Sequence, residues 1–438
     1  MSISQNFPEE GPTLNLNFAG SKVLDPRITF SRPSTSGDAT YMDANGLIVT
    51  AAADEPRFDH RYVNGEIESL GLLVEEQRSN LLPYTEDFSS SWSHIGFTSN
   101  AVDSTYANPT GSLGTKKLIE ETGNIGNQKV LYRYHNVDGA GGNNQIFSHS
   151  CFVKPIGNRH AQLNVHNAGT PARGISVNFD LNNIDTPFST SISSFASSVS
   201  YGVIPYPNGW YKLYLIGNTS SQDSDGTTLA FHVRILNASG SSNYTGDGSS
   251  GLYVYGAQME VGAFPTSYIP TTSSQATRSP DNVSMTGTNF SDWYNQSEGT
   301  IYCSGNNTGI TTTTSRFYYA IENTSSSSGN FIRKWIWNGN TGLLLNSFYT
   351  SNTTGQGSVI SAEFGNTLTT DNKKTAVGYA KSDFASYYNG TSLNTDTSGN
   401  LPVGIDRIRI GTNLSGHISQ LTYYPTRLSN TVLQNLTK

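Results

Sequence analysis

Apolar and polar residues alternate over strand-length runs along most of this chain. The run Ile175–Leu181 places four apolar side chains on one face. The run Leu229–Ile235 does the same, with His232 and Arg234 on the opposite face, and His160–His166 alternates again. A period of two residues, interrupted by turn residues, is typical of half-buried β-strands, and no helical period persists over a dozen residues. The pattern therefore predicts an all-β protein built from sandwiches.

Turn residues, prolines and shifts in composition divide the chain into four segments. Residues 1–90 are rich in turns and predict a small, irregular, β-rich N-terminal unit. Residues 91–272 and 283–438 each carry enough short strands for one β-sandwich. Residues 273–282 continue a proline-containing stretch, and because proline fixes φ and removes a hydrogen-bond donor, we expect an extended linker there.

The last segment also shows a short helical pattern. Leu428, Val432, Leu433 and Leu436 share one helical face, which predicts a helix within 426–436. Ser429 is suited to cap its N-terminus. The strands expected before this helix are Gly299–Ser304, Phe317–Ile321, Phe331–Trp337, Leu343–Phe348, Thr375–Lys381, Ser386–Tyr388, Asp406–Ile410 and Gly416–Tyr423.

Charged residues are denser in the first ninety residues than elsewhere. One interpretation is an ion-pair network within a small cap, and the other is a docking surface onto a larger particle. The residues concerned are Asp25, Arg27, Arg32, Asp54, Arg57, Asp59, Glu75 and Arg78.

Composition and charge exclude several classes of protein. The chain has 438 residues with a formal net charge of −7, and only 13% of its residues are charged, so it lacks the basic surface of a nucleic-acid-binding protein. Its apolar runs fall far short of the roughly 18 residues that a membrane span needs, which predicts no membrane insertion. An aromatic content of 11% argues against disorder.

Aromatic residues supply the candidates for a binding surface. On a strand, Arg333, Trp335 and Trp337 point to the same side, and two indoles beside a guanidinium can stack on the faces of sugar rings. The alternative is that this side belongs to the core, with Arg333 at its edge. Tyr318 and Tyr388 each belong to a tyrosine pair in which one ring should be exposed, and they complete the predicted glycan-binding set.

The sequence offers little for catalysis. Cys151 stands two residues from His149 on one strand, so a reactive pair is conceivable, but a buried thiol is the simpler interpretation. Cys151 and Cys303 lie too far apart in the sequence for a framework disulfide to be expected. Adjacent carboxylates such as Glu120 and Glu121 would point to opposite faces of a strand, whereas a glycosidase needs two that face each other. We therefore expect no enzymatic activity.

Several segments resemble known virion proteins. Residues 14–88, with LDPRITFSRPST and LGLLVEEQRSNLLPYTEDF, resemble a module that is frequent in tailed-phage virion proteins, where it precedes a jelly-roll of the carbohydrate-binding-module type. HSCFVKP, NGWYKLYL and YGAQMEVGAFPTSYIPTT resemble that jelly-roll. DWYNQSEGTIY, YYNGT, IDRIRIG and ISQLTYYPTRLSNTVLQNLT resemble the laminin-G/concanavalin-like domains of phage tail and fibre proteins.

The resemblance implies a tail fibre, spike or similar appendage. Its N-terminal unit would anchor on other virion proteins, and two tandem jelly-roll/concanavalin-like sandwiches would contact host-surface glycans. Such appendages are usually symmetric oligomers, often homotrimers. A virion protein is assembled in the host cytoplasm and released by lysis, which also explains why residues 1–13 show no secretion signal despite a composition typical of extracellular proteins.

Related sandwich modules often hold a structural Ca²⁺, and no other cofactor is implied. Asp223 and Asp225, followed by Gly226, are the candidate ligands, because Ca²⁺ prefers carboxylate oxygens. The alternative at this position is a solvated turn. Two other functions stay open for the whole chain: a purely structural capsid or tail decoration without a ligand, and a glycan depolymerase.

Overall fold

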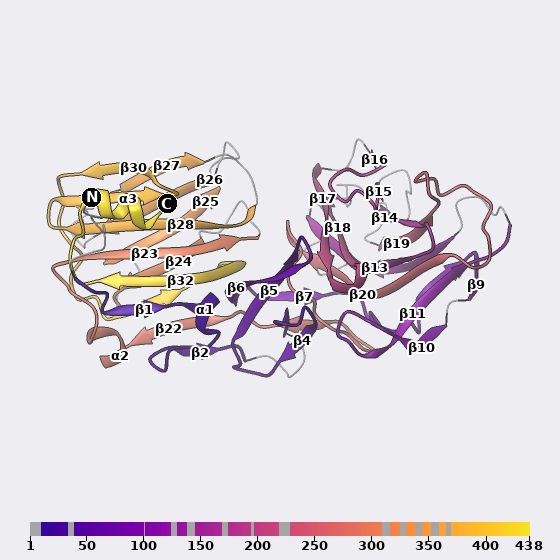
Figure 1. Ribbon diagram of the computed structural model, residues 1–438, viewed down its shortest axis with the longest axis horizontal. Helices are drawn as coiled ribbons and strands as arrows, with labels where there is room; N and C mark the ends of the chain where they lie inside the picture. The colour runs from indigo at the N-terminus through magenta and orange to yellow at the C-terminus, as the bar shows by residue number, and fades with distance from the viewer. Residues whose placement is uncertain are drawn as a thin grey trace, which may run out of the picture.

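The computed structural model describes residues 10–33, 39–99, 101–123, 129–137, 145–168, 174–193, 197–218, 228–308, 316–324, 330–338, 344–351, 359–364 and 369–438; the side chains of residues 335–371 lie outside this description. The predicted all-β fold is confirmed. Two β-sandwiches lie side by side along the long axis of the molecule (Figure 1). The strand pairs among the described residues are antiparallel, and the helical elements described are α1 (Phe18–Ser21), η1 (Pro207–Gly209), α2 (Thr288–Ser291) and α3 (Asn430–Leu436).

The first sandwich packs a seven-stranded sheet against a six-stranded one. Sheet 1 has the order β10 (Val102–Ala107), β11 (Leu113–Glu120), β20 (Gly251–Val261), β13 (Phe147–Ile156), β18 (Trp210–Asn218) and β17 (Ser197–Tyr206), with β9 (Phe97–Ser99) also on β11. Sheet 2 has the order β16 (Ser189–Ile192), β15 (Gly174–Phe179), β14 (His160–Asn167), β19 (Thr228–Leu236), β12 (Val130–Asn136) and β8 (Ser93–Ile95).

The alternation in the sequence explains this core. The apolar positions of the predicted runs, such as Leu163, Val177 and Phe231, point from sheet 2 into the interior, where they are at most 1% exposed. Leu213 and Val254 meet them from sheet 1. The alternate residues of β14 and β19 therefore lie on the outer face of sheet 2, as a period of two requires.

The second sandwich combines strands from both ends of the chain. Sheet 3 has the order β30 (Thr391–Asp396), β29 (Asp383–Tyr388), β28 (Thr369–Ala380), β23 (Glu298–Asn307), β32 (Gly416–Tyr424), β6 (Glu66–Val74) and β5 (Arg57–Val63), with β1 (Leu14–Leu16) also on β32. Sheet 4 has the order β2 (Thr29–Ser31), β22 (Asn282–Thr286), β31 (Arg407–Ile410), β24 (Arg316–Glu322), β25 (Phe331–Asn338), β26 (Leu344–Ser351) and β27 (Val359–Phe364).

Four strands from the first ninety residues, β1, β2, β5 and β6, are thus built into the second sandwich, whereas Leu82 and Phe88 pack in the core of the first. Leu14, Leu16 and Phe18 belong to the core of the second sandwich, where they are at most 3% exposed. Two small ribbons complete the region between the sandwiches: β3 (Ala39–Met42) with β4 (Ile48–Ala51), and β7 (Arg78–Asn80) with β21 (Ala276–Arg278). The second ribbon ties the predicted linker to the N-terminal region; the segment boundaries at residues 90, 272 and 282 stay predictions.

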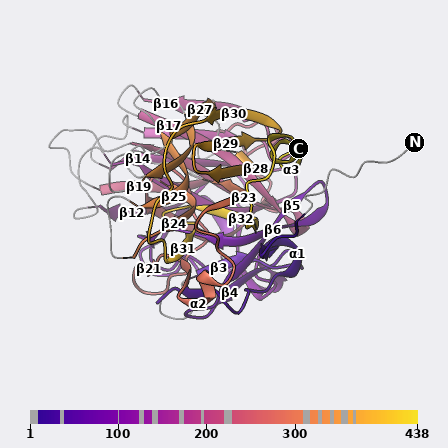
Figure 2. The same ribbon diagram turned by 90° about the vertical axis from the view of Figure 1, so that its left-hand side faces the viewer.

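The predicted C-terminal helix is confirmed as α3. Ser429 caps it, because its hydroxyl accepts a hydrogen bond from the backbone amide of Val432. Leu433 is fully buried against Ala376 and Tyr387 on the outer face of sheet 3. Figure 2, in which the second sandwich faces the viewer, shows α3 beside β28.

Buried ion pairs hold the region between the sandwiches together. We call Arg32, Arg57, Glu75, Arg278 and Asp281 the junction network. Arg57 binds the Glu75 carboxylate at 2.7 Å and the Asp281 carboxylate at 2.6 Å, Arg32 binds Asp281 at 3.0 Å, and Arg278 lies 3.2 Å from Glu75. Burial opposes ionisation of Glu75, but Arg278 and Arg57 hold the pKa of its carboxyl well below its usual value. The N-terminal ion-pair network expected from the sequence is therefore confirmed for Arg32, Arg57 and Glu75. Two of its partners, Arg278 and Asp281, come from outside the N-terminal segment.

Gly71 shows how closely the N-terminal strands approach the second sandwich. Its φ is +95°, and a Cβ atom there would lie 2.4 Å from the Ile418 carbonyl oxygen on β32. Gly65 has a similar φ of +90° but no atom within 4 Å of such a Cβ. We expect Gly71→Ala to lower the free energy of unfolding by roughly 1–3 kcal/mol more than Gly65→Ala, because it adds a backbone clash to the same unfavourable φ.

Urea-induced unfolding of the two variants measures this difference. Gly65→Ala is the matched control, since it shares the conformation without the contact. An equal cost for the two substitutions would mean that β6 and β32 do not approach as described.

Candidate functional site

The predicted aromatic platform on β25 is described only in part. Arg333 is half-buried and binds Glu322 at 2.8 Å, while the side chains of Trp335 and Trp337 lie outside the described part of the structure. Tyr388 is half-buried at the end of β29. The glycan-binding role of these residues therefore stays a prediction.

The expectation that one ring of the Tyr318–Tyr319 pair is exposed is wrong. Tyr318 is 3% exposed and Tyr319 is fully buried, and both belong to the core of the second sandwich. The pairing of β24 with β25 shifts register between Phe317 and Tyr319, as at a β-bulge. Consecutive residues then no longer point to opposite sides, so strict alternation fails at this position.

Within the described residues, no set of side chains is assigned as metal ligands. Asp223 and Asp225 lie outside the described residues, so the predicted calcium site stays a prediction. Elsewhere in the described chain, no group of three or more His, Cys, Asp or Glu side chains is placed to hold a metal ion.

None of the helices in the described ranges has the length and apolar character needed to cross a membrane.

His149 and Cys151 do share one side of β13, and both are at most 1% exposed. Burial raises the pKa of the Cys151 thiol to about 12, so the sulfur is protonated at neutral pH. Burial also lowers the pKa of His149 to about 3, and its ring stacks on Phe231 in the core. A nucleophilic pair needs a thiolate, so the geometry favours the buried thiol over the reactive pair.

The outer face of sheet 2 gathers polar and aromatic side chains in rows. The register places Asn164 opposite His232 and His232 opposite Tyr132. A second row places Arg234 opposite Gln162 and Gln162 opposite Asn178. We call this surface the polar face; its residues are Tyr132, Tyr134, Gln162, Asn164, His166, Ser176, Asn178, His232 and Arg234.

Hydrogen bonds within the polar face fix its side chains in place. Arg234 donates to the side-chain oxygen of Gln162 at 3.0 Å, and the side-chain nitrogen of Gln162 donates to the side-chain oxygen of Asn178 at 2.6 Å. The side-chain nitrogen of Asn178 in turn donates to the backbone carbonyl of Gly240 at 2.9 Å, and a ring nitrogen of His166 lies 2.8 Å from the side-chain oxygen of Asn164. A face whose rotamers are already held loses little conformational entropy when a ligand binds.

The polar face also presents rings. The His232 ring lies 5.3 Å from Tyr132 and 4.7 Å from His166, and Tyr134 is 53% exposed. Burial, together with nearby His166 and Arg234, lowers the pKa of His232 to about 3, so its ring is neutral at physiological pH. His232 Nε2 and Arg234 Nε are buried and have no hydrogen-bond partner among the described residues.

This combination suits a saccharide. Neutral sugars need donors and acceptors for hydroxyl groups and flat rings for their C–H faces, and the polar face supplies both. The alternation in β14 and β19 was predicted from the sequence, but this site was not. One signal in the sequence could have found it: in two runs of strand length, the residues between the apolar positions can all form hydrogen bonds. They are Gln162, Asn164, His166, His232 and Arg234.

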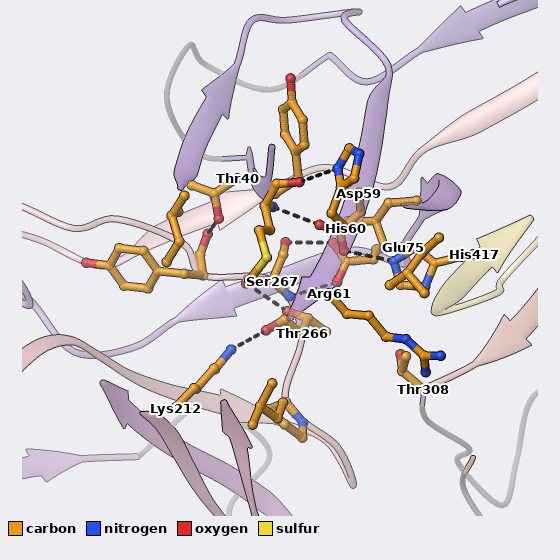
Figure 3. A pocket seen from close by; sticks show the side chains of 18 of the residues that line it. Thr40, Asp59, His60, Arg61, Glu75, Lys212, Thr266, Ser267, Thr308 and His417 are labelled. Carbon is orange, nitrogen blue, oxygen red and sulfur yellow. Dashed lines mark hydrogen bonds and ion pairs between the residues drawn. The ribbon is translucent and has the colours of Figure 1, made fainter. Parts of the chain in front are cut away.

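A cavity between the sandwiches is the second candidate. It has a volume of about 320 Å³ and is lined by β3, β5, β6, β17, β18 and by side chains from β23 and β32 (Figure 3). Its wall is largely aromatic and aliphatic, with Tyr41, Tyr62, Tyr206 and Tyr214 among the lining residues.

Several polar groups that line this cavity are hydrogen-bonded within the protein. Asp59 lies 2.8 Å from a ring nitrogen of His417, whose other nitrogen lies 2.8 Å from the Asn306 carbonyl. Lys212 donates to the Thr266 carbonyl at 2.8 Å, and burial lowers the pKa of its ammonium group (Figure 3). The Asp59–His417 contact joins β5 to β32, and the Lys212–Thr266 contact joins β18 to the segment after β20, so these groups have a structural role.

Comparisons with known proteins give no family for this chain. It matches no protein-family model and no curated protein sequence. Parts of it resemble solved structures. The CBM40 domain of the Ruminococcus gnavus IT-sialidase bound to α2,3-sialyllactose is 16% identical over 33% of this chain and 84% of that one, with a TM-score of 0.27. Domain 4 of the Geobacillus stearothermophilus arabinanase AbnA with arabinotriose is 13% identical over 36% of this chain and 73% of that one (TM-score 0.26), and sheep galectin-11 with glycerol is 8% identical over 29% of this chain and 90% of that one (TM-score 0.21). At these scores the similarity carries no conclusion about ligands.

Proposed function

We propose that this protein is a tailed-phage virion appendage, a tail fibre or spike, that attaches to host-surface glycans through the polar face. The observation that carries the binding proposal is the arrangement of Asn164, His232 and Tyr132 in one row across three strands. That row offers hydrogen-bonding groups and rings on a surface that points away from the core. The assignment to a virion rests on the sequence resemblance alone.

The remaining parts of the proposal follow from this role. A single shallow site binds sugars modestly, so a homotrimer would raise the avidity by presenting several copies. The junction network makes the N-terminal region continuous with the second sandwich, which suits a rigid appendage anchored on other virion proteins. The proposed role requires no enzymatic activity and no cofactor.

A glycan array probed with the full chain tests the proposal. We expect the wild type to bind a subset of bacterial-surface glycans, and the double variant Tyr134→Ala/Asn164→Ala to bind them about 10-fold to 100-fold more weakly. Each lost hydrogen bond or ring contact in a held site is worth roughly 0.5–1.5 kcal/mol. Tyr134 is 53% exposed and Asn164 half-buried, so the fold should survive both substitutions.

The matched control is Trp335→Ala/Trp337→Ala in the second sandwich. Loss of binding in this variant alone, with the fold intact, would move the glycan site to β25 and contradict the polar face. A wild type that binds no glycan would favour the purely structural decoration, and sugar release from host envelope material would favour the depolymerase.

A further inference from the structure

Three arginines surround one carboxylate on the second sandwich. Glu322 accepts hydrogen bonds from Arg333 at 2.8 Å, from Arg407 at 2.7 Å and from Arg409 at 2.6 Å. We call these four residues the arginine cluster. Burial opposes ionisation of Glu322, but hydrogen bonds from Arg409 and Arg333 hold the pKa of its carboxyl below its usual value. The cluster therefore contains three cations and one anion at neutral pH.

The sheet register explains why these side chains meet. Glu322 lies opposite Arg407, and Ala320 lies opposite both Arg409 and Arg333. Residues that alternate with them, such as Ile321 and Ile408, point into the core. The arginine cluster therefore lies on the outer face of sheet 4.

The arginine cluster differs from the junction network in charge and in exposure. The arginines of the junction network are fully buried against the two carboxylates of Glu75 and Asp281. In the arginine cluster, the side chains of Arg333, Arg407 and Arg409 are 18%, 29% and 35% exposed and share a single carboxylate. An excess of two positive charges is thus held at the surface of a protein whose formal net charge is −7.

The arginines also keep donors for a further anion. Each binds Glu322 through Nε or Nη2, and among the described residues no Nη1 atom of the three has a hydrogen-bond partner. Arg333 is further held by its position 3.8 Å above the centre of the Phe331 ring. Guanidinium groups held in this way are suited to bind carboxylate or phosphate oxygens through more than one hydrogen bond.

We propose that the arginine cluster is a binding site for the anionic groups of an acidic polysaccharide, with Glu322 positioning the three guanidinium groups. The site lies on a different sandwich from the polar face, so it stands whether or not the polar face binds a neutral sugar. A uronic-acid carboxylate and a polyol phosphate share the required chemistry, and both occur in surface polysaccharides.

Binding of two purified polymers to the full chain tests this proposal. Hyaluronan oligosaccharides supply carboxylates, a glycerol phosphate polymer supplies phosphates, and dextran is the neutral reference. We expect one or both acidic polymers to bind, dextran to bind at least tenfold more weakly at this site, and the affinity to fall as salt is raised. Arg407→Gln/Arg409→Gln should weaken binding of the acidic polymer at least tenfold.

A control variant removes a positive charge from another part of the protein. Arg27→Gln breaks the partly exposed pair with Asp25 and should leave binding of the acidic polymers unchanged. Tyr134→Ala/Asn164→Ala should also leave it unchanged, because the polar face lies on the other sandwich. Unchanged binding in Arg407→Gln/Arg409→Gln, or no binding of either acidic polymer to the wild type, would overturn the proposal. Tighter binding of a single-stranded oligonucleotide than of both polymers would overturn it as well.

Discussion

Replacing Asp281 with asparagine should lower the free energy of unfolding by about 3–5 kcal/mol, since this is the usual cost of removing one partner of a buried ion pair. Asp281 accepts from Arg32 at 3.0 Å and from Arg57 at 2.6 Å, and these three side chains are fully buried. Its carboxylate also accepts from the backbone amide of Glu75 at 2.9 Å. A neutral amide at this position would leave an uncompensated positive charge on the buried arginines.

Urea-induced unfolding, followed by tryptophan fluorescence, measures this effect. Asp25→Asn is the matched control, because the Asp25–Arg27 pair is partly exposed and surface pairs of this kind contribute about 0–1 kcal/mol. A loss in Asp281→Asn no larger than in Asp25→Asn would show that the junction network does not hold the N-terminal region to the sandwiches.

Acid should destabilise the first sandwich through His149. The pKa of this buried histidine is lowered from 6.5 to about 3, chiefly by burial. In the unfolded chain the ring takes up a proton as the pH falls through about 6.5, while in the folded chain it stays neutral until about pH 3. Stability is therefore full above pH 6.5 and declines between pH 6.5 and 3, by up to about 5 kcal/mol.

Unfolding midpoints in urea, measured from pH 7.5 to pH 3.5, test this dependence. His149→Leu should make the decline shallower because it removes one buried histidine whose pKa is about 3, while His232, whose pKa is lowered likewise, keeps its contribution. His94→Leu is the control, since His94 is exposed and its removal should change the slope little. A decline of the same steepness in wild type and His149→Leu would contradict the role given to His149.

The parts of the fold that local alternation encodes were predicted well. Ile175–Leu181 contains most of β15, and Leu229–Ile235 lies within β19, because a strand with one buried face shows its period in its own residues. The pairing of Leu14 with Tyr423 was not predicted. Pairing between strands so distant in sequence leaves no trace in a local pattern, so the placement of β1, β2, β5 and β6 in the second sandwich came only from the structure.

The candidate sites were missed or only partly predicted for the same reason, because a local pattern does not show which strands lie next to each other. Alternation shows that Asn164 and His166 share a side of one strand, but it does not show that His232 lies on the neighbouring strand. The sequence singled out Arg57 and Glu75 as charged neighbours, yet Asp281 stood in a segment interpreted as a linker. Tyr318 was misplaced because a bulge breaks the alternation on which the prediction relied.

A crystal structure of the full chain with the tightest-binding saccharide from the array locates the glycan site. We expect the sugar on the outer face of sheet 2, with hydroxyl groups bonded to Asn164 and a ring face against Tyr132 or Tyr134. A saccharide seated instead on β25 or in the cavity beside Lys212 and His417, with the outer face of sheet 2 unoccupied, would contradict this placement.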